Sequence, residues 1–255
     1  NKDGQINPEA IKEKITKKTK LISIMFANNE LGSINNVAEI AEIANSEGII
    51  LHVDAVQCIG KLPINLNDLG IDLMSISAHK FYGPKGIGAL FIRKGINLNP
   101  ILDGGGQELN LRPGTENIAG IAGLGLAIKK TCDNIEKSIE YIKKLETRFI
   151  EQLNKYNLNY ILHIEERLPG VLAIGFPGID GQSLLIALDL KGIAISFGSA
   201  CSSGTTKASK ILLDVGIKED LAKSTLRISF GKIHSNDDID YVAKELSSII
   251  NRINK

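Results

Sequence analysis

The chain has 255 residues, enough to bury the core of one large domain and part of another. Its 30 basic and 29 acidic side chains nearly cancel, so the charge balance argues against a polyanionic partner such as nucleic acid. Hydrophobic residues make up 43%, as in ordinary α/β proteins, and no apolar run reaches the length of a membrane-spanning helix.

The first part of the chain predicts a strand, a helix and a second strand. Residues 21–27 (LISIMFA) and 49–53 (IILHV) are short apolar runs of strand length that end at polar residues. The segment between them has apolar residues at helical spacing and opens with Asn36 and Glu39, arranged as a capping box. This order predicts a parallel strand pair, and ligands of open α/β sheets collect at the carboxyl ends of such strands.

Polar residues follow three of the predicted strands. Asn29 follows the first run, Asp54 follows the second, and Lys80 follows a third apolar run at 71–76. A lysine at the mouth of a buried strand is expected to be desolvated, which lowers its pKa from about 10.4 and makes the amine nucleophilic. Such a lysine can form a Schiff base with a carbonyl, including that of pyridoxal phosphate.

The neighbouring side chains have the chemistry of a site for that cofactor. Asp54 could keep a pyridine nitrogen protonated, and the amides of Asn29 and Gln57 could bind the oxygen on the ring. Ser77 and His79 flank the lysine and could bind phosphate, and the histidine could also carry protons. Taken singly, the aspartate would be a turn residue and the lysine a solvated one. Together, the strand ends favour a cofactor site.

The middle of the chain predicts a long helical stretch over about 116–156 and a domain boundary within it. In its second half apolar residues recur every three or four positions, the pattern of an amphipathic helix. We therefore expect three parts: residues 1–130 as the C-terminal part of a large cofactor-binding domain, 131–160 as a connecting helix, and 161–255 as a small α+β domain. The small domain is expected to have strands at 171–176, 194–196 and 225–230, and helices at 182–190 and from 235 onward.

Cys201 lies in a loop of small residues, Ser196–Thr206 (SFGSACSSGTT), between a predicted strand and a predicted helix. A reactive cysteine needs exposure and mobility, whereas a structural one normally has bulky apolar neighbours. Composition alone leaves both readings open for Cys201. Cys58 and Cys132 have the surroundings of packing residues, and none of the three cysteines has CxxC spacing, which predicts neither a disulfide framework nor a zinc site. Free thiols suit a reducing compartment, so we expect a cytoplasmic protein.

Six segments carry a resemblance to a known family: HVDAVQ (52–57), SAHKFYGPKG (77–86), GGGQE (104–108), RPGTEN (112–117), SFGSACSSG (196–204) and LRISFG (226–231). In order and spacing they resemble the NifS/IscS-type cysteine desulfurases, pyridoxal-phosphate enzymes of the class V aminotransferase group. The resemblance implies an α/β fold of the aspartate aminotransferase type (fold type I), with a mostly parallel sheet in the large domain and a small C-terminal α+β domain.

The resemblance also implies catalytic and substrate-binding roles. Lys80 is similar to the Schiff-base lysine that moves the substrate α-proton, His79 to the histidine packed on the cofactor, and Cys201 to the residue that takes the substrate sulfur as a persulfide. Arg227 and Asn29 are similar to substrate-binding residues, and the planar guanidinium suits a carboxylate. Without the resemblance, an arginine in an alternating strand is more often simply solvated.

The cofactor-binding residues that the resemblance implies are Asn29, Asp54, Gln57, Ser77, His79, Lys80 and Thr115, with no metal. The threonine resembles one that reaches the phosphate of the other subunit, which implies a homodimer. The implied substrate is L-cysteine, converted to L-alanine. The implied partner is a sulfur-acceptor protein of iron–sulfur cluster assembly or tRNA thiolation, with no direct contact to nucleic acid or membrane.

Other readings remain open at this stage. The chain could belong to another class V enzyme, an aminotransferase or a selenocysteine lyase. An aminotransferase would not need Cys201 in its loop. It could also be a catalytically silent piece that serves as a docking scaffold. In the family, a preceding segment supplies a Gly-Thr phosphate turn and a ring-stacking histidine. We therefore expect this chain to be a fragment that lacks the N-terminal portion and binds the cofactor poorly by itself.

Overall fold

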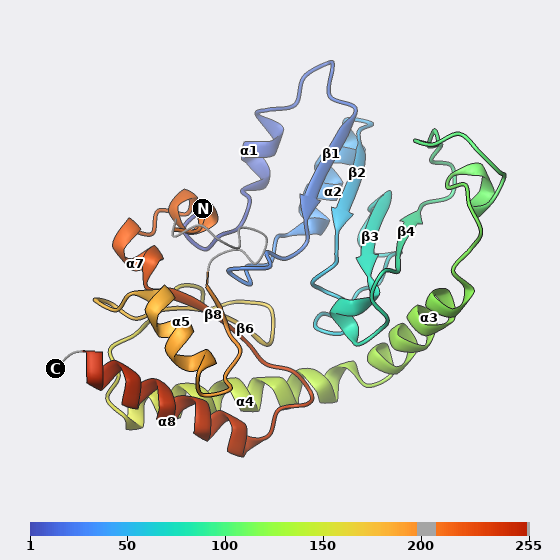
Figure 1. Ribbon diagram of the computed structural model, residues 1–255. Coiled ribbons are helices and arrows are strands. Elements are labelled where there is room, and N and C mark those ends of the chain that lie inside the picture. Colours follow the sequence, from blue (N-terminus) through green and yellow to red (C-terminus); the bar gives the residue numbers. More distant parts are fainter. Residues whose placement is uncertain (198–207, 254–255) are drawn as a thin grey trace. The chain divides into compact units, whose positions relative to one another are not determined.

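The computed structural model describes residues 1–197 and 208–253, which form two compact units. The N-terminal unit contains residues 8–26 and 36–135, and the C-terminal unit contains residues 1–7, 27–35 and 136–255 (Figure 1). Residues 27–35 therefore belong with the C-terminal unit, although the sequence places them in the first domain. No helix in the described ranges is long and apolar enough to cross a membrane.

The N-terminal unit is built on a four-stranded sheet with the order β1-β2-β3-β4. Its strands are β1 (Leu21–Met25), β2 (Ile50–Asp54), β3 (Leu73–Ser77) and β4 (Gly88–Ile92). The first three are parallel, as the strand–helix–strand pattern predicts, with α2 (Val37–Ser46) as the crossover helix. The last strand runs antiparallel to β3 and was not predicted.

The remaining helices of the N-terminal unit are short, except for one. They are α1 (Pro8–Lys12) and the single 3-10 turns η1 (Ala78–Phe81) and η2 (Glu108–Asn110), with α3 (Ile118–Cys132) as the long one. The prediction of one helical stretch over 116–156 is wrong, because α3 ends at Asp133 and α4 (Ile135–Lys155) begins after it. Asp133 and Asn134 have short polar side chains that compete for backbone hydrogen bonds, which favours a helix end here.

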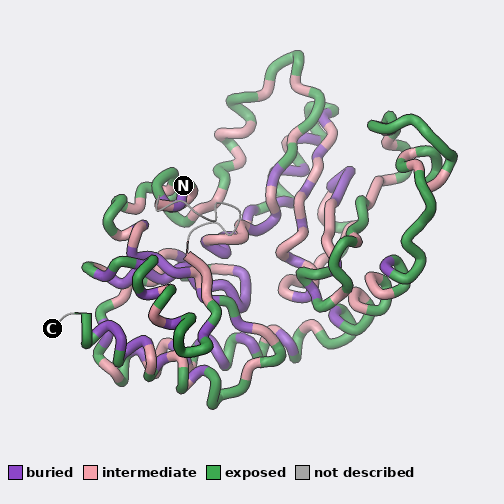
Figure 2. The backbone as a smooth tube through the Cα atoms, in the orientation of Figure 1, coloured by how far each residue is buried: buried purple, intermediate pink, exposed green. Residues whose placement is uncertain are grey.

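The C-terminal unit has an antiparallel sheet with the order β5-β6-β8-β7. Its strands are β5 (Ile161–Leu162), β6 (Val171–Gly175), β7 (Ser196–Phe197) and β8 (Thr225–Ser229), and its helices besides α4 are α5 (Gly181–Asp189), α6 (Lys210–Asp214), α7 (Glu219–Lys223) and α8 (Asn236–Ile253). Apolar residues of α4, α5, α8 and the sheet form one buried core, seen as the purple segments of Figure 2. On its surface, the guanidinium of Arg148 on α4 donates to both carboxylate oxygens of Asp240 on α8, at 2.8 and 2.6 Å.

Both predicted helix starts are confirmed by their side-chain contacts. Asn36 Oδ1 accepts the Glu39 N–H at 3.4 Å, and Asn36 Nδ2 donates to Glu39 Oε2 at 2.8 Å. At the start of α8, the Ser235 N–H donates to Asp238 Oδ2 at 2.7 Å, and Ser235 Oγ accepts the Asp238 N–H at 3.3 Å. These reciprocal bonds satisfy N–H groups that a helix leaves unpaired at its first turn.

Candidate functional site

The carboxyl edge of the N-terminal sheet carries several of the predicted site residues. Asp54 is the last residue of β2 and pairs in register with Ser75, while Ser77 is the last residue of β3. The η1 turn begins directly after Ser77 and contains His79 and Lys80. Because β2 and β3 are parallel, these side chains come from the same edge of one sheet, as ligands of open α/β sheets require.

The η1 turn decides which of its side chains reach solvent. In a 3-10 turn, side chains three residues apart lie on the same side, and Ala78 and Phe81 are both buried. The Phe81 carbonyl also accepts a bond from Thr131 Oγ1 on α3, at 3.4 Å. The two residues between them, His79 and Lys80, are therefore held outward by an anchored turn.

One predicted property of Lys80 is wrong for the chain as described. The sequence predicts a desolvated amine, but Lys80 is exposed. The buried side of the η1 turn is occupied by Ala78 and Phe81, so the lysine lies on its solvent side. Within the described ranges its ammonium group forms no ion pair. Any desolvation of the amine must therefore come from a ligand or from a further polypeptide surface.

The other polar groups at this edge are partly satisfied within the unit. Asp54 Oδ1 accepts the Val56 N–H at 2.9 Å, so the aspartate has the turn contact that the simpler reading expects, and within residues 1–197 and 208–253 its second oxygen has no hydrogen bond. Ser77 Oγ and His79 Nδ1 are 2.9 Å apart, a contact that orients the imidazole ring. Gln57 is half-buried shortly after β2. Carboxylate, amide, hydroxyl, imidazole and amine groups are thus gathered at one sheet edge.

A hydrogen-bonded row across the sheet supports this edge. His52 Nδ1 lies 2.8 Å from Ser23 Oγ on β1, and His52 Nε2 lies 2.7 Å from Ser75 Oγ on β3. His52 is thus a strand residue with hydrogen bonds to both neighbouring strands. His52 and Asp54 share one face of β2, because side chains two residues apart point the same way. The row therefore links three strands on the face that carries the aspartate.

Arg227 lies on β8 in the C-terminal unit and is half-buried. Its Nη1 donates to the Asn29 carbonyl at 3.0 Å, and its Nη2 donates to Ser196 Oγ at 3.0 Å. The simpler reading of a solvated arginine is therefore wrong, since two contacts hold the side chain. The guanidinium has further N–H groups besides these two, so it can still bind a carboxylate.

Asn29 is placed by the tight hairpin formed by residues 27–34. The side-chain Oδ1 of Asn28 accepts the N–H groups of Glu30 and of the residue after it, at 2.8 and 2.9 Å. The Glu30 carboxylate accepts Ser209 Oγ at 2.6 Å. These contacts hold the hairpin in the C-terminal unit and turn the Asn29 carbonyl toward the arginine.

The predicted site residues thus divide between the two units. Asp54, Gln57, Ser77, His79, Lys80 and Thr115 belong to the N-terminal unit, and Asn29 and Arg227 to the C-terminal unit. Thr115 is exposed in the loop before α3, and Cys201 lies outside the described residues. No group of three or more potential metal ligands occurs in the part of the chain that the structure describes. The residues that the sequence missed, Ser23 and Ser75, are signalled only by the alternation of polar residues along the strands.

The chain is similar to known proteins along almost its whole length. It is 42% identical over 255 residues to a protein of Dictyoglomus turgidum named cysteine desulfurase IscS, covering 99% of this chain and 65% of that protein. It is 43% identical over 254 residues to a Clostridium botulinum protein of the same name, covering 98% of this chain and 64% of that one. The chain therefore spans about two thirds of the length of these relatives, at most 65%.

Solved structures show the same fold. A NifS-like protein superposes with a TM-score of 0.90 at 34% identity, over 98% of this chain and 66% of that chain. A NifS-like protein from Rickettsia africae gives a TM-score of 0.89 at 35% identity, over 98% and 68%. The family model described as aminotransferase class-V matches residues 1–242. The chain therefore belongs to the class V aminotransferase family.

Proposed function

We propose that the protein containing this chain is a pyridoxal-phosphate-dependent cysteine desulfurase, which converts L-cysteine to L-alanine and holds the released sulfur on Cys201. The observation that carries this proposal is the placement of Asp54, Ser77, His79 and Lys80 at the carboxyl edge of one sheet. The relatives named cysteine desulfurase IscS support it across 99% of this chain. In this view the N-terminal unit is part of the large cofactor-binding domain.

The donor groups of the N-terminal unit fit pyridoxal phosphate. When bound, this cofactor supplies an aldehyde that an amine can capture and a ring that accepts electrons from the substrate α-carbon. The second carboxylate oxygen of Asp54 can hold a proton on the ring nitrogen, and the Gln57 amide can bind the ring oxygen. Ser77 and His79 offer a hydroxyl and a ring nitrogen to the phosphate. Thr115 would serve the phosphate of a second copy of the chain.

Lys80 then has two tasks that its position allows. Its exposed amine can bind the aldehyde carbon, and once released it can take the proton from the substrate α-carbon and return one to the product. The η1 turn supports this by burying the residues on either side, Ala78 and Phe81, so that only the lysine and His79 face outward. His79, already oriented by Ser77, can pack against the ring or relay a proton.

The C-terminal unit supplies the groups for the substrate. The guanidinium of Arg227 binds the carboxylate of the amino acid, beside the Asn29 side chain, because two existing contacts hold it in place. The thiolate of Cys201 attacks the sulfur of the substrate, the carbon–sulfur bond breaks, and the electron pair and a proton go to carbon. The products are L-alanine and a Cys201 persulfide, so atoms and electrons balance without an external oxidant.

We also infer a homodimer and a sulfur-acceptor protein, in iron–sulfur cluster assembly or tRNA thiolation. The homodimer is supported by apolar side chains of the N-terminal unit that remain exposed, among them Leu90 at 47%, Leu102 at 65% and Ile118 at 75%. Such surfaces normally face another polypeptide. A reactive Cys201 thiol also suits a reducing cytoplasm.

The cofactor assignment is tested by comparing two exposed lysines of the same loop. The protein containing this chain is mixed with pyridoxal phosphate, the linkage is reduced with borohydride, and the modified lysine is found by peptide mapping. We expect label on Lys80 and its loss in Lys80→Ala, with unchanged labelling in the matched control Lys85→Ala. Equal labelling of both lysines would contradict a specific Schiff-base site.

The desulfurase assignment is tested through the cysteines. Alanine and sulfide release from L-cysteine should be lost in Cys201→Ala and retained in Cys132→Ala, because Cys132 is an exposed thiol at the end of α3 with no proposed role. Full turnover by Cys201→Ala would instead favour an aminotransferase or a lyase that does not use a protein thiol.

A further inference from the structure

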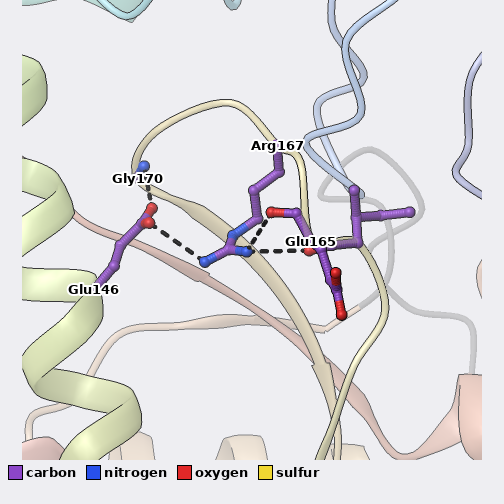
Figure 3. Close-up of polar contacts among 5 residues, drawn as sticks. Glu146, Glu165, Arg167 and Gly170 are labelled. Carbon is purple, nitrogen blue, oxygen red and sulfur yellow. Dashed lines mark hydrogen bonds and ion pairs between the residues drawn. The ribbon is translucent and has the colours of Figure 1, made fainter.

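Glu146 on α4 is a buried carboxylate that has no part in the proposed chemistry. Only 8% of the residue is exposed, and its carboxylate accepts the Gly170 N–H and a bond from Arg167 Nη2 at 3.3 Å. Arg167 Nη1 in turn donates to the carbonyls of Ile164 and Glu165, at 3.1 and 2.9 Å (Figure 3). One carboxylate thus joins the helix to the loop that precedes β6.

A first set of contacts leads from Glu146 to Arg227 through the sheet. The Gly170 carbonyl accepts the Phe230 N–H at 2.9 Å, and the next residue, Val171, starts β6. Within the β6–β8 pair, Ala173 lies in register with Arg227. The bond from Glu146 to the Gly170 N–H therefore fixes the end of the ladder from which the arginine projects.

A second set of contacts leads from Glu146 to Asn29 through the hairpin. Arg167 holds the loop, and the Leu168 N–H donates to the Gly32 carbonyl at 2.7 Å. Gly32 has a φ of +77° and lies so close to Val171 that an added Cβ would be 3.1 Å from the Val171 carbonyl oxygen. The hairpin therefore rests directly on the loop that Glu146 holds.

The two sets of contacts meet again at the substrate site, because Arg227 Nη1 donates to the Asn29 carbonyl. The hydrogen bonds and the stretches of backbone between them thus form a closed ring within the C-terminal unit, with Glu146 on one side and the Asn29–Arg227 contact on the other. We propose that Glu146 is a positioning residue, which sets the place of the Arg227 guanidinium through Gly170 and Arg167. The amino-acid carboxylate as the ligand of that guanidinium rests on the proposed function.

A carboxylate in this place is poorly explained by stability alone. Desolvation is the main influence on it and raises the pKa of Glu146, and the Gly170 N–H and Arg167 only partly oppose this. Buried ion pairs often contribute little net stability compared with apolar residues of similar size. Among the described residues the buried Nε of Arg167 has no hydrogen-bond partner, so the pair does not satisfy all of its polar atoms there. Two apolar residues in place of Glu146 and Arg167 could not form the hydrogen bonds that hold both Gly170 and the loop around Arg167.

The test reads the guanidinium directly and does not depend on activity. The chain has only six arginines, so their Nε–H signals can be resolved in a ¹⁵N-labelled sample, with Arg227 assigned by its loss in Arg227→Lys. We expect Glu146→Gln to shift the Arg227 signal. The matched control Glu140→Gln, which removes an exposed carboxylate paired with Lys144 on the same helix, should leave it in place. If Glu146→Gln does not fold, Arg167→Lys provides the test, because it weakens the contacts that lead to the hairpin of residues 27–34 and leaves the Gly170 contact of Glu146 in place. It should also shift the Arg227 signal.

Turnover supplies the second reading. In the cofactor-loaded protein that contains this chain, Glu146→Gln should raise the KM for L-cysteine about tenfold while kcat stays within about twofold, since lost positioning weakens ground-state and transition-state binding alike. An unshifted Arg227 signal in folded Glu146→Gln would overturn the proposal. So would a loss of activity that only follows the folded fraction in thermal melts. A shifted signal, together with a protein containing this chain that neither binds nor turns over L-cysteine when loaded with the cofactor, would uphold the positioning role and reject the proposed function.

Discussion

The C-terminal unit presents Arg227 from a closed core, whereas the N-terminal unit presents Lys80 from a sheet that keeps much apolar surface open. The arginine is held by two hydrogen bonds and by a ladder packed on buried residues of α4 and α8. The lysine is exposed, and its loop and α3 appear mostly as exposed segments in Figure 2. The chain therefore orders Arg227 and Asn29 by its own contacts, whereas Lys80 has an exposed amine that is not ordered in this way.

The open surface of the N-terminal unit includes an apolar pocket of about 500 Å³. Residues of β3 and β4, such as Ile76 and Phe91, form part of its wall, and Ile128 and Cys132 of α3 form another part. Pockets lined almost entirely by apolar groups favour contact with other apolar groups. The N-terminal unit is therefore expected to gain more stability from partners than the C-terminal unit does.

The largest effect should come from a matched pair of leucines, one in each unit. Leu145 is 1% exposed and Leu102 is 65% exposed. We expect Leu145→Ala to lower the free energy of unfolding by about 2–5 kcal/mol, because it leaves a cavity in a packed core, and Leu102→Ala to change it by less than about 0.5 kcal/mol. Urea denaturation measures both, and equal losses would remove the contrast between the two units.

A second effect depends on pH and concerns the C-terminal unit alone. His163 Nε2 lies 2.8 Å from Thr225 Oγ1, whose hydroxyl proton goes to the Leu221 carbonyl, so the imidazole donates from Nε2. Burial lowers the pKa of His163 to about 4 from an ordinary 6.5. The unfolded chain therefore takes up a proton before the folded one does, and the stability of the unit should fall as the pH drops from about 6.5 to about 4.

The size of this loss should be on the order of 1–2 kcal/mol, because the imidazole keeps some contact with solvent. It is measured as the difference between the parent chain and His163→Gln in urea denaturation at several pH values. Glu146, whose raised pKa acts in the opposite direction as the pH rises, cancels in that difference. A parent chain that follows the pH dependence of His163→Gln would show that burial of the imidazole does not matter.

The smallest effect compares the helix caps of the two units. Asn36→Ala and Ser235→Ala each remove side-chain bonds at the start of a helix, α2 in one unit and α8 in the other. Each should cost about 1 kcal/mol within its own unit. Hydrogen exchange followed along the chain would show whether protection is lost in one unit or in both. Loss throughout the chain for either variant would mean that the two units unfold together.

Sequence reasoning succeeded where the signal was local. The helix start at Asn36, the start of the last helix near Ser235 and the strands that end at Asp54 and Ser77 depend on residues only a few positions apart, and the structure contains each of them. Sequence reasoning failed after Cys132, where α3 ends. The spacing of apolar residues predicts one continuous helix there, but the short polar side chains that follow end it. The spacing of apolar residues shows which side of a helix is buried, but it does not show whether one helix or two consecutive helices carry that side.

The sequence by itself determined the α/β class, the parallel pairing of the first two strands and the residues that end them, because alternation, helical spacing and caps follow from neighbours along the chain. Only the tertiary structure decided that Arg227 donates to the carbonyl of Asn29, from which it is 198 residues distant, and that Glu146 accepts the Gly170 N–H. It also decided that Lys80 is exposed. Contacts and burial of this kind depend on which distant segments pack together, and no local pattern of residues contains that information.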